Sequence, residues 1–191
     1  ATYLIRDDAS TFHTYYMDVA TGAPRYGNTQ QGYADDSCWS RGQAWGIYGF
    51  LLSYIYTGDE TMIALSKRLA NYFLNRLPED YVCHWDLALV GTDALRDSSS
   101  AAIAVCGLLE LVKQLPVTDP DRERYLEWAK GIMSTLTKHY LMGKEEKGNG
   151  LLKHSVYHLA SNKGVDECAS WGDYFYVEAL VRFTQSWKLY W

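Results

Sequence analysis

One short segment, DSCWSRGQAWGIYGF, carries four side chains suited to recognising a flat, charged ligand: Trp39, Arg41, Gln43 and Trp45. The helical period that follows them places all four in the first two turns of a helix, with Arg41 and Trp45 four residues apart on one face. A cation near the positive end of a helix is unfavourable unless an anion lies close by. The segment therefore predicts a site for a carboxylate or a sulfate.

An alternative for Arg41 is a purely structural one, in which the guanidinium stacks on a tryptophan and pairs with Asp35 or Asp36. Upstream, the loop GNTQQGY (27–33) is bounded by glycines, and its amides and carboxamides could hold sugar hydroxyls. The alternative is that this loop is only a connection. His13 lies among aromatic residues of the expected hairpin, where a lone histidine more often has a structural than a catalytic role.

Acidic residues do not form an obvious catalytic couple. Glycoside hydrolysis normally uses two carboxylates that flank the bond, whereas the acidic pairs at 7–8, 35–36 and 166–167 are sequence neighbours that point apart. Asp173 could reach inward from the start of a helix, but a capping or ion-pairing role is the simpler interpretation. In RDSSSA (96–101) we expect a helix cap with a local arginine pair. The motifs of serine or cysteine hydrolases, nucleotide-binding loops and dinucleotide folds are absent from the sequence.

Composition excludes several classes of function. Eighteen basic and 23 acidic residues give a net charge of -5, without the basic run that nucleic acid requires. The four cysteines are far apart and form no CxxC pair, which predicts reduced thiols of a cytoplasmic protein and no metal site. No apolar stretch approaches the ~20 residues that span a bilayer. The start, ATYLIRDDASTFHTYY, lacks the basic end and apolar core of a signal peptide.

Aromatic residues make up 15% of the chain, as 16 Tyr and 7 Trp against 5 Phe. Rings with polar edges combine stacking area with hydrogen bonds, which suits a cleft for polyhydroxylated ligands. The alternative is that these rings pack between helices.

The periodicity predicts helical hairpins preceded by one β-hairpin. An alternating segment (11–18), the turn TGAP and RYGNTQ favour the β-hairpin. Helical patterns follow at 39–56, from TGDE to before Pro78, at 98–115, at 119–136 and at 171–187. The segment 98–115 is apolar on nearly all faces and should be a buried helix. Buried and amphipathic helices alternate, which favours a closed α/α barrel. Closure takes about six hairpins and the chain supplies nearer three, so we expect an all-α fold that is about half of a barrel.

Four motifs in order, STFHTYYMD, DSCWSRGQAWGIYGF, RDSSSAAIAVCGLLEL and GVDECASWGDYFYVEAL, resemble the unsaturated glucuronyl hydrolases over the whole chain. This resemblance implies an (α/α)6 barrel of which residues 1–191 are the C-terminal half. It also implies hydrolysis by hydration of a vinyl ether. An Asp protonates C4 of the 4,5-unsaturated uronic acid left by polysaccharide lyases on glycosaminoglycan fragments and activates the water that adds at C5. The hemiketal then opens and expels the other sugar.

The resemblance also assigns roles to residues. It implies a substrate-binding shell of His13, Gly27, Thr29, Gln31, Arg41 and Trp45, supported by Trp39 and Gln43. It implies no cofactor or metal. The family's acid/base Asp and a second essential Asp lie upstream of Ala1, so the missing N-terminal half would be the partner of this chain, which we expect to be inactive alone.

Members of the family that prefer sulfated substrates carry an Arg before QGY and a later SxxSxK. Here the corresponding residues are Gln30, His158, Ser161 and Lys163. Two of the four elements are changed, so we do not expect a strong preference for sulfated disaccharides, although His158 could give a pH-dependent affinity. Two alternatives stay open: a sugar-binding module without catalysis, and a relative of the rhamnogalacturonyl hydrolases.

Overall fold

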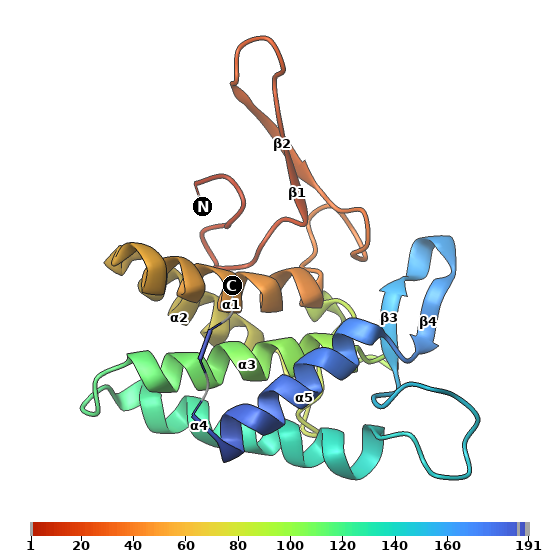
Figure 1. Cartoon of the computed structure of the whole chain (residues 1–191). Helices are drawn as coiled ribbons and strands as arrows, with labels where there is room; N and C mark the ends of the chain where they lie inside the picture. Colours follow the sequence, from red (N-terminus) through yellow and green to blue (C-terminus); the bar gives the residue numbers. More distant parts are fainter. Residues whose placement is uncertain (1, 187, 190–191) are drawn as a thin grey trace.

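The computed structural model describes residues 2–186 and 188–189, and within them five α-helices dominate (Figure 1). Their bounds are α1 (Ser40–Thr57), α2 (Glu60–Leu74), α3 (Ser98–Gln114), α4 (Pro120–Thr135) and α5 (Ser170–Thr184). A π-helical turn, Leu136–Tyr140, extends α4. All five helices were predicted. The expected end of the last helix at residue 187 lies outside the described residues, and α5 ends three residues earlier, at Thr184.

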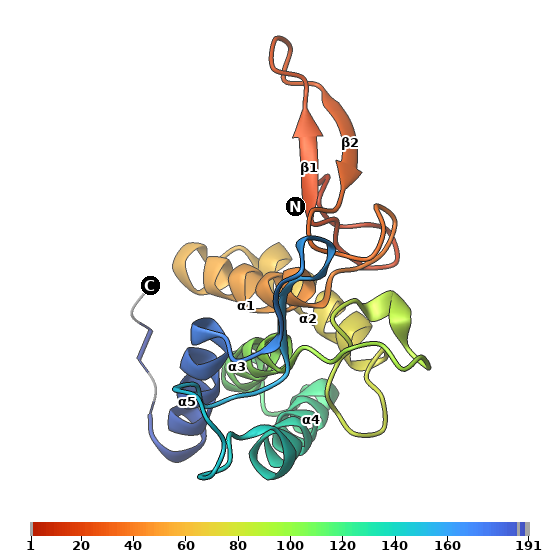
Figure 2. The same ribbon diagram turned by 90° about the vertical axis from the view of Figure 1, so that its right-hand side faces the viewer.

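The helices form two layers. In the first layer α3 packs between α1 and α5, while α2 covers α1 and α4 covers α3 in the second (Figure 2). Helix α3 is buried along most of its length, as its apolar sequence predicted. A Cβ atom at Gly107 would lie 2.8 Å from Ile47 Cγ2, so glycine allows α3 to approach α1 closely. The predicted alternation of buried and half-exposed helices is only partly right, because α1 and α5, also expected to be buried, bury no larger a share of their residues than the amphipathic α2.

Local signals set the helix ends. Asp59, Asp97 and Asp119 precede α2, α3 and α4, and each carboxylate accepts a hydrogen bond from a backbone N–H of the first turn. Helix α1 ends at Gly58, whose φ of 71° is the left-handed conformation that glycine adopts without strain. The TGDE sequence thus ends one helix and starts the next, as predicted.

Two separate β-hairpins flank the helices. The predicted one pairs β1 (Thr14–Met17) with β2 (Pro24–Asn28) and projects away from α1 (Figure 1). The sequence interpretation missed the other, which pairs β3 (Ser155–His158) with β4 (Lys163–Glu167). Its turn is a 3₁₀ segment, Leu159–Ser161, closed by Asn162 at a φ of 50°. Asn and Gly in NKG are turn signals, but strands this short leave little alternation to detect.

Within the part of the chain that the structure describes, the outer side of α5 exposes apolar side chains. Four large apolar side chains are exposed along α5 at intervals of three residues: Tyr174, Val177, Leu180 and Phe183. At 3.6 residues per turn these four positions spread over about half of the helix circumference. Large exposed apolar side chains grouped on one half of a helix are typical of a surface that another part of a protein covers.

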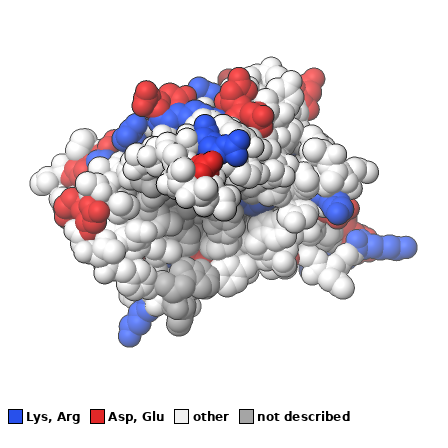
Figure 3. All heavy atoms as spheres, turned by 90° about the horizontal axis from the view of Figure 1, so that it is seen from above, with Lys and Arg blue, Asp and Glu red and all other residues white. Residues whose placement is uncertain are grey.

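Charged side chains of both signs are interspersed on the face of the molecule seen from above (Figure 3). All four cysteines are free thiols, and Cys38, Cys83 and Cys106 are buried. Within the described residues, no helix has the length and apolar character that a bilayer crossing requires.

Candidate functional site

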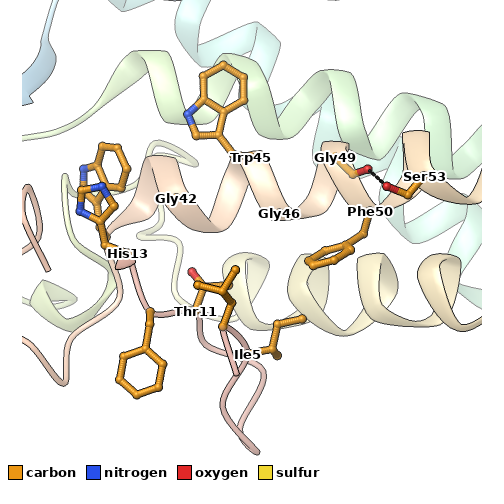
Figure 4. A pocket seen from close by; sticks show the side chains of 12 residues that line it. Ile5, Thr11, His13, Gly42, Trp45, Gly46, Gly49, Phe50 and Ser53 are labelled. Carbon is orange, nitrogen blue, oxygen red and sulfur yellow. Dashed lines mark hydrogen bonds between the residues drawn. The ribbon is translucent and has the colours of Figure 1, made fainter. Parts of the chain in front are cut away.

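A pocket of about 580 Å³ lies along the first turns of α1, where the chain segment before β1 crosses the helix. The wall of this pocket includes the rings of His13, Trp39 and Trp45. Glycines at 42, 46 and 49 leave the adjoining face of α1 without side chains at these positions (Figure 4). Trp45 is 38% exposed and packs against Phe175 of α5 in a T-shaped pair, with ring centroids 5.1 Å apart. The pocket therefore offers an indole face, as a site for a sugar ring requires.

His13 is held with its Nδ1 atom facing the polar loop. Nδ1 accepts hydrogen bonds from the backbone N–H groups of Gln30 (3.0 Å) and Gln31 (3.1 Å), and Thr29 Oγ1 lies 3.4 Å away. The imidazole packs on Trp39 with ring centroids 4.3 Å apart. Burial and the positive charge of Arg41 lower the pKa of His13 below its usual 6.5. The structure thus favours the neutral ring.

The loop reaches His13 because Gly27 leaves room for it. A Cβ atom at this position would lie 2.3 Å from a ring carbon of Phe12, so a larger residue would push the two segments apart. Beyond it, Thr29 Oγ1 accepts a hydrogen bond from Gly32 N–H at 2.7 Å, and Thr29 N–H donates to Asp35. The polar loop is therefore ordered by its own side chains and is more than a connection.

Arg41 is buried, with 3% of its surface exposed, and does not belong to the pocket wall. The guanidinium pairs with Asp97 at 2.9 Å and donates to the backbone oxygens of Val156 (2.7 Å) and Tyr157 (2.9 Å). Burial lowers its pKa, and the attraction of Asp97 opposes this. The anion that a cation at this helix start requires is thus supplied from within the chain. The alternative partners considered from the sequence, Asp35 and Asp36, were wrong.

Aromatic rings enclose the guanidinium on both sides. Its Cζ atom lies 4.5 Å from the ring centroid of Trp39 and 5.2 Å from that of Trp171. The stacking on a tryptophan that the alternative interpretation predicted is therefore present. Trp39 links this stack to the pocket, because His13 packs on it as well.

Asp97 combines two roles in one fully buried carboxylate. Oδ1 caps α3 by accepting from the N–H groups of Ser99 and Ser100, as the RDSSSA motif predicted. Oδ2 accepts from Arg41 and from the Ser100 hydroxyl. The predicted local arginine pair was wrong in its partner, because Arg96 pairs with Asp80.

Gln43 supports the site from behind. Its Nε2 group donates to the backbone oxygens of Ala9 (2.9 Å) and Leu69 (3.1 Å), and its Oε1 atom accepts from the Cys38 thiol. The fully buried amide therefore ties the start of α1 to α2 and to the segment before β1. Asp173 likewise has a structural role, since its carboxylate accepts from the N–H groups of Leu151 and Leu152.

The β3–β4 hairpin carries the residues predicted for sulfate binding. The Ser161 hydroxyl lies 2.7 Å from His158 Nδ1, and His158 pairs in register with Lys163. Gln31 connects this hairpin to the polar loop by donating to Tyr157 O at 2.6 Å, whereas the Gln30 side chain points to the Tyr16 hydroxyl at 3.4 Å. The charge of His158 also contributes to the lowered pKa of His13, so the hairpin tip belongs to the same electrostatic environment as the pocket.

Comparisons with known proteins agree with the predicted family. An unsaturated chondroitin disaccharide hydrolase of Streptococcus pneumoniae is 51% identical over all of this chain, which matches 48% of that protein. An unsaturated glucuronyl hydrolase of Bacillus sp. (strain GL1) is 40% identical over 99% of the chain and 50% of its own length. The chain therefore matches about half of each of these hydrolases. No family model matches it.

Solved structures of unsaturated glucuronyl hydrolases carry the same fold. The Streptococcus agalactiae enzyme matches 99% of this chain with 48% of its own length, at 50% identity and a TM-score of 0.94. A variant of that enzyme complexed with dGlcA-GalNAc6S matches 98% of the chain with 50% of its own length, at 51% identity and a TM-score of 0.89. These hydrolases have an (α/α)6 barrel, so the predicted fold class is confirmed. The chain spans about half the length of the relatives it matches.

Proposed function

We propose that residues 1–191 are the C-terminal half of a glycoside hydrolase that removes 4,5-unsaturated uronic acid from glycosaminoglycan disaccharides and oligosaccharides. The observation that carries this proposal is a pocket with aromatic and imidazole walls, and no carboxylate among the described residues that line it. Such a pocket can hold a sugar ring but cannot protonate it. The acid/base Asp is therefore expected in the half of the protein that would cover the exposed face of α5.

His13 and Trp45 are proposed to contact the unsaturated sugar, with Trp45 stacking on its ring and His13 donating a hydrogen bond. Thr29 and Gln31, in the loop that starts at Gly27, would surround its hydroxyl groups. Arg41 is proposed to act through its positive charge behind Trp39 and by holding the β3 backbone, because Asp97 already occupies its guanidinium. No cofactor and no metal are needed, since hydration of a vinyl ether requires only a proton donor and a water.

Turnover is measured by the loss of ultraviolet absorbance as the enol ether of an unsaturated chondroitin disaccharide disappears. We expect no loss with residues 1–191 alone, and a loss when a matching N-terminal half is present. Bleaching by the chain alone would show that its acid is not missing. Binding without turnover in the complete protein would favour the second candidate, a non-catalytic sugar-binding protein, and turnover only on pectin fragments would favour a rhamnogalacturonyl hydrolase.

Sulfate recognition is proposed to be weak and to depend on Lys163 with Ser161 and His158. Gln30 cannot supply the positive charge that an Arg would provide beside the loop. The complete protein should cleave unsulfated and sulfated disaccharides at comparable rates, with Lys163→Ala slowing only the sulfated one. Lys144→Ala, an exposed lysine of the 144–150 loop, is the control. If the sulfated and unsulfated disaccharides are cleaved at equal rates both by the unsubstituted protein and by Lys163→Ala, Lys163 has no role in sulfate recognition.

The cellular location is proposed to be the cytoplasm. Support comes from the four free thiols of a chain that forms no disulfide among its described cysteines.

A further inference from the structure

We propose that Asp86 is a positioning residue, which orders the polar loop so that His13 carries its proton on Nε2. Asp86 is fully buried and does not belong to the pocket wall. It lies in the segment between α2 and α3, 73 residues after His13 in the chain (86 minus 13). Nothing in the sequence motifs singled it out.

The tautomer of His13 follows from its neighbours. A backbone N–H can only donate, so Nδ1 must present its lone pair to the amides of Gln30 and Gln31. A neutral imidazole has one N–H, which must then be on Nε2. Nε2 has no hydrogen-bond partner within the part of the chain that the structure describes, and the ring lines the pocket. His13 therefore presents a donor to whatever occupies the pocket.

The two amides can hold this arrangement only if the loop keeps its shape, and beyond the end of β2 at Asn28 the loop contains neither helix nor strand. Asp86 anchors its last residue, Tyr33, and the residues that lead from it to α1 with three hydrogen bonds. Oδ2 accepts from Tyr33 N–H at 2.9 Å and from the Ser37 hydroxyl at 2.6 Å, while Oδ1 accepts from Cys38 N–H at 3.2 Å. A fourth bond, from Ala88 N–H at 3.0 Å, fixes the carboxylate to its own segment.

A carboxylate suits this position because all four partners are donors and a carboxylate is acceptor only. An amide at the same place would turn an NH₂ group towards one pair of donors and leave them without an acceptor. Asp35, the other carboxylate bonded to the loop, is exposed and lies in the same connection between β2 and α1. Asp86 is therefore the carboxylate that ties this connection to another part of the fold, in addition to the bond from Gln31 to Tyr157 O.

The test uses Asp86→Asn, which keeps the shape of the side chain, in the 191-residue chain labelled with ¹⁵N-histidine. In the unsubstituted chain we expect the His13 spectrum of an unprotonated Nδ1 and a protonated Nε2. In the variant we expect a mixture of the two tautomers and a higher His13 pKa, because donors that favour the neutral ring are lost. Asp18→Asn is the control, since Asp18 also accepts backbone N–H groups in a turn but lies at the hairpin tip.

A folded Asp86→Asn variant with the original His13 spectrum would overturn the proposal. If that variant does not fold, Ser37→Ala decides, since it removes one of the anchoring donors: a partial shift towards the second tautomer supports the proposal, and an unchanged spectrum overturns it. That Nε2–H faces a sugar rests on the proposed function. A changed tautomer without any change in kcat/KM of the complete protein would refute that role of His13 and leave the positioning by Asp86 intact.

Discussion

Removing the charge of Asp97 should destabilise the chain far more than its position at a helix start would suggest. In Asp97→Asn the oxygen Oδ1 can still cap α3, but an NH₂ group replaces the Oδ2 atom that accepts from Arg41 and Ser100. The side chains of Arg41 and Asp97 are only 4% and 0% exposed, so the remaining guanidinium would be a buried charge without a counter-ion. Breaking such a pair costs about 3–5 kcal/mol of unfolding free energy.

Urea unfolding followed by tryptophan fluorescence measures this loss, since the chain has 7 Trp. A chain of this size loses about 2–4 °C of melting temperature per kcal/mol, which gives a decrease of about 6–20 °C in Asp97→Asn. The matched control is Asp119→Asn, which also removes the charge of a helix cap. Lys67 and Asp119 are 25% and 18% exposed, and such solvent-screened pairs contribute about 1 kcal/mol or less.

A loss in Asp97→Asn that is within about 1 kcal/mol of the loss in Asp119→Asn would refute this reasoning. A second variant tests the cause directly. If the uncompensated charge is responsible, Arg41→Met combined with Asp97→Asn should be more stable than Asp97→Asn alone, because the double variant has no buried charge to desolvate. A double variant that is less stable would indicate that lost packing around the guanidinium, and not its charge, determines the effect.

Three other predictions follow from single positions. Gly107→Ala should lower the free energy of unfolding by about 1–3 kcal/mol, because its Cβ would lie 2.8 Å from Ile47 in a closely packed interface. At Gly49 an added Cβ would have no atom within 4 Å, so Gly49→Ala should instead stabilise α1 by up to about 1 kcal/mol. The two urea midpoints should move in opposite directions, and a stabilising Gly107→Ala would contradict the packing argument. The pKa of His13 is lowered in the folded chain, so His13 contributes folding stability that is fully present above its unfolded pKa of 6.5 and is lost as pH falls through its folded pKa. The free energy of unfolding should therefore decrease less steeply below pH 6.5 in His13→Gln than in the unsubstituted chain. An equal decrease in the two chains would contradict the lowered pKa. Finally, Trp45→Phe should weaken sugar binding in the complete protein while leaving the melting temperature nearly unchanged, since the indole is half-exposed; a large loss of stability would assign Trp45 to the core.

Some features of this protein were accessible from the sequence because they depend on neighbours in the chain. Helix starts at Asp59, Asp97 and Asp119 follow from capping, which involves residues two or three positions apart. The burial of α3 follows from its uninterrupted apolar pattern. The motif around Arg41 and Trp45 indicated the family without any knowledge of the fold. Such signals depend on residues that are close in the chain, so they can be recognised in the sequence without the fold.

The partners of the buried charges were decided only by the tertiary structure. Arg41 could have paired with Asp35 or Asp36 by sequence proximity, but the packing of α1 against α3 brings Asp97 to it from 56 positions away. Asp86 acquires its role in the same way, because the segment between α2 and α3 folds back under the polar loop. A buried polar group must find its complement wherever the chain places one. The sequence alone determined which side chains could recognise a charged sugar, whereas the packing of distant segments decided which of them face the pocket and which hold the others in place.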